Sequence, residues 1–178
     1  VVEENEIYKN TTIKDSPYKA LGAGLLVTKL KSNTGKGFIR KNYIHHNQSL
    51  SDLSFGGGIF YLLTHDQKAT EFYPTYFENN IIESNYSTSY GGGIACWYLW
   101  ASSSAPELDP IFVNNTIVDN EAALGSGLTV IDAEVAMVNN IMNNIIPDGG
   151  SEIFEDLFYF VREPKIMPYW PDNENTAD

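Results

Sequence analysis

The chain has 178 residues and a formal net charge of −12, because 11 Lys and Arg residues face 23 Asp and Glu residues. Nucleic acids and anionic membrane surfaces are bound through cationic side chains, so this composition argues against both as partners. The length suits one domain with a real core, and no apolar run is long enough to insert across a bilayer.

One motif recurs along the chain after the acidic stretch at residues 1–6. The motif starts with an apolar residue, and Asn follows three residues later. A second apolar residue comes two residues after that Asn, and a second Asn comes three residues after the second apolar residue. A glycine followed by an aliphatic residue closes the motif, and we call this pair the Gly-aliphatic step. The clear copies span residues 39–59, 77–94 and 112–128. A degenerate copy is expected from Tyr8, with Thr11 and Ser16 at the Asn positions. A last copy is expected from Met137 to Ile153.

Each run between these landmarks is too short for an ordinary helix and is rich in β-branched and aromatic residues, which is typical of short strands. Stacked copies place like strands side by side in parallel. The pattern therefore predicts an all-β fold, a right-handed parallel β-helix (solenoid) of about five rungs over residues 1–154. Residues 155–178, with three prolines, are expected to form a C-terminal cap or linker tail.

The recurring Asn and Gly residues have a structural explanation. Asn tolerates left-handed backbone geometry at sharp turns, and its amide both donates and accepts, so Asn residues on adjacent rungs can form a ladder. The fourth column reads Ser16, Asn47, Asn85 and Asn120, with Ile145 breaking it. Gly permits backbone bends where a Cβ would clash. We therefore exclude these residues from the predicted binding site.

The spacing between copies varies because of inserted residues after the Gly-aliphatic step. Between the second apolar positions the spacing is 31 from Ile13 to Ile44 and only 25 from Ile117 to Met142. The three long connections are residues 26–38, 60–76 and 95–111. Insertions in a solenoid fall on one face, often the binding face, so these loops are expected to build a wall along one side.

The loops supply the candidate ligand-binding residues, which are aromatic, acidic or imidazole side chains that suit sugar recognition. These residues are Tyr73, Tyr76, His65, Asp66, Trp97, Tyr98, Trp100, Glu107 and Asp109. The first loop adds lysines at 29, 31 and 36. The alternative for Trp97, Tyr98 and Trp100 is that they pack onto the outer sheet and hold the loop down.

The segments Asn79-Asn80-x-Ile82-x-x-Asn85 and Gly91-Gly92-Gly93-Ile94 resemble the repeats of pectate-lyase-like parallel β-helices. They also resemble bacterial surface and secreted β-helix repeat proteins, and the resemblance covers roughly residues 7–154. It implies the fold and an extracellular or cell-surface location. It implies little about a reaction, because this fold carries many functions.

Two functions from different classes remain open. The first is a non-catalytic, adhesin-like module that binds a glycan or a protein partner through the loop wall. The second is a carbohydrate-active enzyme, a polysaccharide lyase or glycoside hydrolase, that uses the same face. We prefer the first, because the acid pairs in the loops are weak signals among 23 acids and no lyase signature is evident. The net charge also disfavours a polyanionic substrate unless the few cations cluster.

No metal site or cofactor is predicted. Cys96 is the single cysteine, so it forms no disulfide framework and is expected to be a buried small residue. His45, which precedes His46, is expected to lie in a solvated outward column with Lys14 and Glu83. Because a solenoid needs capped ends, we expect other domains of a longer parent chain, or a second copy, to cover the first rung.

Overall fold

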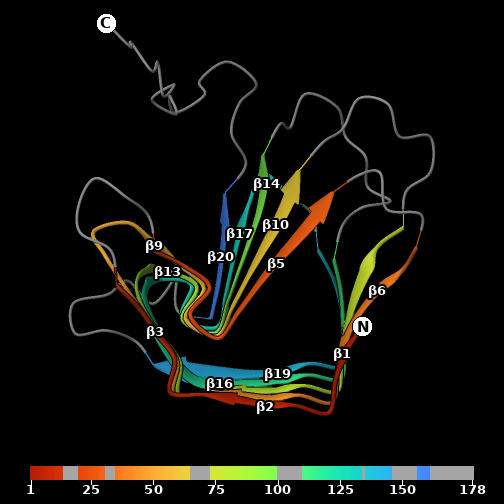
Figure 1. The fold of residues 1–178 in the computed structure, drawn as a ribbon, viewed down its shortest axis with the longest axis horizontal. Helices are drawn as coiled ribbons and strands as arrows, with labels where there is room; N and C mark the ends of the chain where they lie inside the picture. The colour runs from red at the N-terminus through yellow and green to blue at the C-terminus, as the bar shows by residue number, and fades with distance from the viewer. Residues whose placement is uncertain are drawn as a thin grey trace, which may run out of the picture.

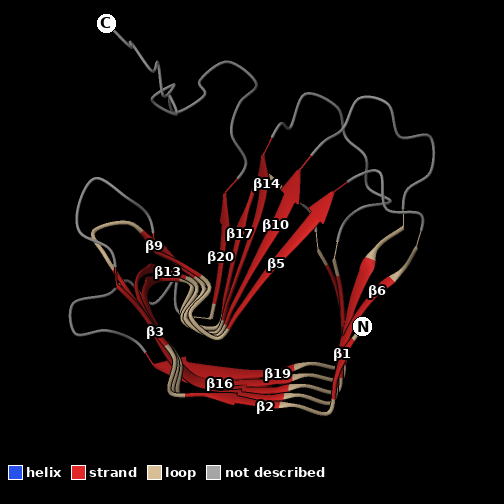
Figure 2. Cartoon of the chain, in the orientation of Figure 1, coloured by secondary structure: helices blue, strands red, loops and turns tan. Residues whose placement is uncertain are grey.

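The computed structural model describes residues 1–13, 20–30, 35–64, 73–99, 110–133, 135–145 and 156–160. These residues form twenty short strands joined by turns and loops, and every pairing between described strands is parallel (Figures 1 and 2). The strands belong to three sheets, which we name A, B and C.

Sheets A and C each contain five strands. Sheet A is formed, in spatial order, by β1 (Val2–Glu3), β6 (Gly37–Arg40), β11 (Thr75–Glu78), β15 (Ile111–Val113) and β18 (Ala136–Val138). Sheet C is formed by β5 (Leu25–Leu30), β10 (Ile59–Thr64), β14 (Ile94–Leu99), β17 (Leu128–Ile131) and β20 (Leu157–Phe160).

Sheet B contains ten strands in two arms that share β16 (Thr116–Leu124). The first arm is β2 (Glu6–Tyr8), β7 (Tyr43–His45), β12 (Ile81–Glu83), β16 and β19 (Ile141–Ile145). The second arm is β3 (Thr11–Ile13), β8 (Gln48–Leu50), β13 (Tyr86–Tyr90) and the end of β16, with β9 (Ser54–Phe55) beside β13 and β4 (Ala20–Leu21) beside β9.

The chain visits the sheets in a fixed cycle. It runs from β6 in sheet A through β7, β8 and β9 in sheet B to β10 in sheet C, and then returns to sheet A as β11. Seen along the stack, sheet B lies at the bottom and left of Figure 1, sheet A at the right, and sheet C between them. The all-β architecture with parallel sheets is therefore confirmed, and it fits a parallel β-helix.

The core is built from like residues stacked on like residues. Ile44, Ile82 and Ile117 are fully buried neighbours in sheet B, and the rings of Phe77 and Phe112 in sheet A stack with centroids 4.6 Å apart. In β12, for example, Ile82 is buried while its neighbours Ile81 and Glu83 are not, because side chains alternate across a strand. This burial of apolar surface is the main source of stability.

Both Asn ladders are present and longer than the sequence predicted. Each ladder Asn donates its amide to the Oδ1 of the next, at 2.8–3.0 Å. The first ladder is Asn5, Asn42, Asn80, Asn115 and Asn140. The second is Asn10, Asn47, Asn85, Asn120 and Asn144.

The predicted register of the first copy was wrong by six residues. The structure pairs Val2 with Ile39 and Ile7 with Ile44, so Asn5 and Asn10 occupy the ladder positions assigned to Thr11 and Ser16. The prediction matched Ile13 to Ile44, whereas Ile13 pairs with Leu50. Apolar residues recur at both spacings here, so the apolar pattern alone could not choose between them.

The last copy also differs from the prediction. Asn144, one residue before Ile145, continues the second ladder, because the register between β16 and β19 shifts by one residue there. In sheet C, Leu157 pairs with Leu128. That position had been assigned to Ile153, which lies outside the described residues. The sheet therefore continues past residue 154 into β20.

The left-handed backbone positions lie beside the ladders. The residue before each ladder Asn except Asn144 has positive φ, as in Asn79 (φ 54°) and Ser84 (φ 52°). The ladder Asn itself is not among the positive-φ residues. The Asn side chain thus secures a turn that the preceding residue makes, which corrects the expectation that the ladder residue adopts the left-handed conformation. Such a conformation costs a non-Gly residue on the order of 1 kcal/mol.

The Gly91–Gly93 turn uses glycine for two different reasons. Gly91 has a φ of +62°, which most side chains rarely adopt. At Gly92 a Cβ would lie 2.4 Å from the backbone oxygen of Glu121 in the next coil. The backbones of neighbouring coils can approach this closely only because no side chain lies between them.

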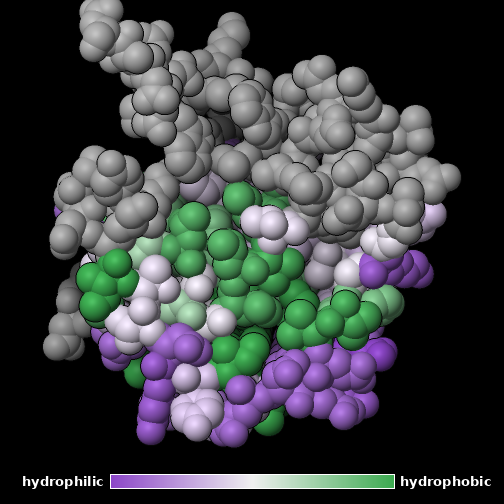
Figure 3. All heavy atoms as spheres, in the orientation of Figure 1, coloured by the Kyte–Doolittle hydropathy of each residue, from purple (hydrophilic) through white to green (hydrophobic). Residues whose placement is uncertain are grey.

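Apolar side chains gather in the middle of the face drawn in Figure 3, and hydrophilic side chains lie below them. The strands β1, β2 and β5 lie at the edges of the stacks, so no further strand of the described residues covers their apolar side chains. The side chains that pack against the core there but are only partly buried are Val2, Ile7, Leu25 and Val27. Ile13 and Leu26 are 70% and 47% exposed.

Candidate ligand-binding site

The three long connections leave and return along one side of the molecule. They are shorter than predicted, because residues 26–30, 60–64 and 95–99 belong to β5, β10 and β14. They begin at the ends of these strands, where Leu30, Thr64 and Leu99 are register partners. They end at β6, β11 and β15, which are neighbours in sheet A. All three therefore run from sheet C to sheet A. The expectation that they emerge from a common side is confirmed for their described ends.

Trp97 and Tyr98 lie in β14, and their side chains are 6% and 7% exposed. Trp97 belongs to an apolar cluster with Phe55 and Phe60, and its ring stacks on Phe55 with centroids 5.2 Å apart. Tyr98 belongs to the main core. This burial favours the packing alternative for both residues, because neither ring presents an open face to a sugar.

Of the other predicted site residues, Tyr73 and Tyr76 are described and are half-buried. His65, Asp66, Trp100, Glu107 and Asp109 lie outside the described residues.

Trp97→Phe is expected to lower the free energy of unfolding by about 1.5 kcal/mol, because the smaller ring leaves part of the packed volume empty. Urea unfolding followed by fluorescence or circular dichroism measures this loss. Unchanged stability would contradict the packing role that the buried position indicates.

The outer face of sheet A carries an aromatic pair beside cations. Phe38 and Tyr76 are register partners, and their rings stack with centroids 5.3 Å apart. The Lys36 ammonium lies 5.5 Å from the Tyr76 ring, and the Arg40 guanidinium lies 5.5 Å from the Phe38 ring. We name these four residues the sheet A row. Cations over aromatic faces are attracted by the ring quadrupole.

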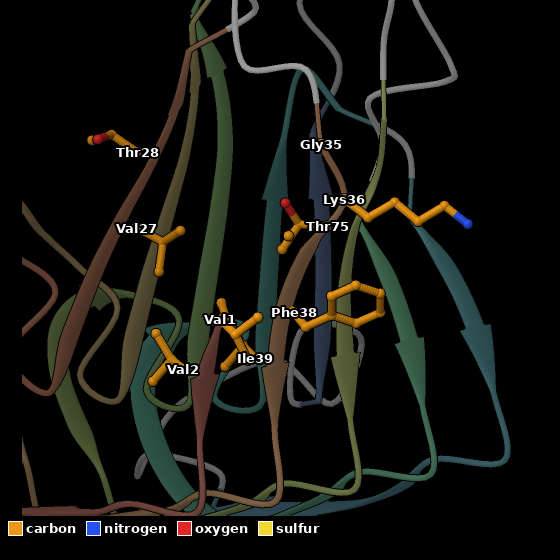
Figure 4. Close-up of a pocket in the computed structure, with 10 residues that line it drawn as sticks. Val1, Val2, Val27, Thr28, Gly35, Lys36, Phe38, Ile39 and Thr75 are labelled. Carbon is orange, nitrogen blue, oxygen red and sulfur yellow. The ribbon is translucent and has the colours of Figure 1, made fainter.

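A hollow of about 390 Å³ lies next to this row, at the base of the first long connection. Figure 4 shows its apolar wall, with Val2 and Val27 on the inner side of β6 and Phe38 and Lys36 on the outer side. Thr28 and Thr75 add hydroxyl groups. Its lining falls largely within two of the predicted loops, 26–38 and 60–76, although Phe38 and Thr28 were not among the predicted site residues.

The arginine of the sheet A row is already paired. The Arg40 guanidinium lies 2.9 Å from the Glu3 carboxylate, and the Lys41 ammonium lies 3.0 Å from Glu4. The hydrogen bond from Arg40 holds the pKa of Glu3 below its usual value, and the same bond raises the pKa of Arg40. The bond with Glu4 raises the pKa of Lys41. Both groups stay charged and bound to acids of the neighbouring coil.

The outer face of sheet B carries a second polar cluster. Tyr8, His45 and Glu83 are register partners, so the column expected to contain Lys14 contains Tyr8 instead. The His45 ring stacks between Tyr8, at 5.2 Å, and Tyr43, at 4.0 Å. His45 is only 9% exposed, which contradicts the expectation that it is solvated.

His45 forms hydrogen bonds through both ring nitrogens. The Glu6 carboxylate, 3.2 Å from Nε2, accepts one of them. Nδ1 lies 2.8 Å from His46 Nδ1, and the tautomers of the two rings set which of them donates. Tyr43 donates to Glu83, and this bond raises the pKa of Tyr43. The cluster binds three strands together and shows no nucleophile or oxyanion donor set.

Cys96 is fully buried in the main core, and burial raises the pKa of its thiol well above the ordinary value. Its thiol is therefore protonated and is not a nucleophile in the folded chain. This agrees with the prediction of a buried small residue.

No known protein family, curated protein or solved structure matches this chain. The likeness to β-helix repeat proteins therefore rests on the repeat, the parallel sheets and the Asn ladders. Across the described ranges, no helix is long and apolar enough to span a membrane. Those ranges also contain no group of three or more His, Cys, Asp or Glu side chains that could hold a metal ion.

Proposed function

We propose that this chain is a non-catalytic module of an extracellular or cell-surface protein. It binds a glycan on the side where residues 26–38, 60–76 and 95–111 leave the sheets. We also propose the right-handed form of the β-helix, with about five rungs, because parallel crossovers are right-handed in nearly all proteins. The resemblance to pectate-lyase-like and bacterial surface repeat proteins supports the location.

The arrangement of the loop ends carries this proposal. Three insertions project from neighbouring strand ends, and a stacked aromatic pair lies on the adjacent face of sheet A. Inserted loops held by a rigid scaffold are where binding usually occurs. Aromatic side chains supply apolar contact to sugar rings, and the half-buried pair Phe38 and Tyr76 lies on the outer face of sheet A, beside the ends of these insertions.

Tyr76→Ala is expected to weaken glycan binding about tenfold, because it removes one ring of the aromatic pair. A glycan array identifies the ligand, and calorimetric titration measures the affinity. Tyr86→Ala is the matched control, since Tyr86 is also a half-buried strand tyrosine but lies in sheet B.

A parallel assay follows the absorbance of unsaturated sugar products and the release of reducing ends. Binding without turnover is the expected result. Turnover of any polysaccharide would instead establish the lyase or hydrolase alternative, and the absence of glycan binding would overturn the proposed function.

A further inference from the structure

The described cations differ in whether an acid neutralises them. Arg40 and Lys41 are paired with acids of the first coil at 2.9 and 3.0 Å. Lys36 forms no ion pair within the described part of the chain, and its side chain is exposed. Among the described residues, its ammonium makes a cation–π contact with the Tyr76 ring, whose centroid lies 5.5 Å away. Lys36 is therefore a cation beside an aromatic surface with its charge still available.

The position of Lys36 is suited to a ligand group on the outer face of sheet A. Figure 4 shows its side chain on the outer side of β6, the side of Phe38, pointing away from the apolar wall of the hollow. The space beside it is open, because a Cβ added at Gly35 would meet no atom within 4 Å.

The surroundings limit how much negative charge can be accommodated. Glu3, Glu4 and Glu78 lie on the same sheet A strands or the turn beside them, and the whole chain carries −12. Glu3 and Glu4 are paired with Arg40 and Lys41, so further acidic groups of a ligand would meet Glu78 and the net charge of the chain, and like charges repel. These charges favour one anionic group beside Lys36 over a row of them.

We propose that the glycan site prefers a largely neutral oligosaccharide bearing one acidic group, a carboxylate or a sulfate ester, which pairs with Lys36. This inference rests on the proposed function, because it names the ligand class of that site. The sugar ring packs against Phe38 and Tyr76, and the acid lies by the ammonium. A polyanionic polymer is disfavoured by the surrounding acids.

The test compares four probes by calorimetric titration: a neutral oligosaccharide, the same sugar with one terminal uronic acid, the same sugar with one sulfate ester, and a polyuronate. At least one singly acidic probe is expected to bind about tenfold more tightly than the neutral probe. Raising NaCl from about 0.05 to about 0.5 M should remove most of that preference, because salt screens exposed charges.

The variants assign the preference to one side chain. Lys36→Gln should abolish it, and Lys36→Arg should retain it. Lys9→Gln is the matched control, since the Lys9 ammonium also lies over a tyrosine ring, at 5.8 Å from Tyr8, but on sheet B. Equal affinity for neutral and acidic probes, or tighter binding of the polyuronate, would overturn this inference and leave the proposed function standing. Failure of every probe to bind would overturn both.

Discussion

Gly92→Ala is expected to lower the free energy of unfolding by about 3 kcal/mol or more, because it forces a side chain between two closely packed coils. The new Cβ would lie 2.4 Å from the Glu121 oxygen and 2.6 Å from its nitrogen and carbonyl carbon. All three are backbone atoms of the next coil, so no side-chain rotation relieves the clash. The coils would have to separate, and the hydrogen bonds between them would lengthen.

Urea unfolding followed by far-ultraviolet circular dichroism measures this effect. Gly35→Ala is the matched control, because a Cβ there has no neighbour within 4 Å and the change should be small. A stable Gly92→Ala protein with wild-type unfolding would show that the coils are not as closely apposed as described.

Asn80→Ala is expected to cost about 4 kcal/mol, because it removes four hydrogen bonds in a buried site. The Asn80 amide donates to the oxygen of Ile39 at 2.8 Å and to Asn115 Oδ1 at 2.9 Å. Its Oδ1 accepts from the backbone and side-chain nitrogens of Asn42, at 3.1 and 3.0 Å. Asn80 is 1% exposed, so water cannot easily replace the lost partners.

Asn5→Ala tests the same ladder at its edge. Asn5 is exposed, and its amide bonds to Glu3 and Asn42 can be replaced by water, so the expected loss is below about 1 kcal/mol. Equal losses for the two variants in denaturant titrations would contradict the view that burial makes the central ladder positions important.

These two substitutions act at one kind of contact, the interface between successive coils. In a repeat protein each unit touches chiefly its neighbours, so stability depends on those interfaces. Gly92 sets how closely two coils approach, and Asn80 links three successive coils. A substitution at either position should therefore destabilise the packing of neighbouring coils and not only the turn in which it lies.

The candidate site was predictable only in outline. The lengths of residues 60–76 and 95–111 indicated insertions after the Gly-aliphatic step, and the shared strand register places their ends together. The individual residues were harder to predict. Trp97 is the kind of residue that often contacts sugar rings, but here it packs beside Phe55, because the second arm of sheet B covers that face of sheet C. Phe38, an outward strand residue, lines the hollow instead.

The neighbours of His45 on the outer face of sheet B were also predicted incorrectly. Lys14 was expected beside His45, but an offset of six residues in the first copy places Tyr8 there. That offset also changed the identity of the ladder residues, from Thr11 to Asn5. The sequence held a signal for the correct register, because Val2, Asn5, Ile7 and Asn10 have the full spacing of the motif, whereas the copy taken from Tyr8 lacks both Asn residues.

The sequence alone determined the repeating unit, the parallel stacking and the common origin of the long loops, because these follow from residues that recur at matched positions. Only the tertiary structure decided that Asn144 takes the place of Ile145 in the second ladder, which aromatic rings are buried, and which of the described cations have no ion pair. Those outcomes depend on the register between neighbouring coils and on the packing of one sheet against another. Such contacts form between residues far apart in the chain, so local pattern does not specify them.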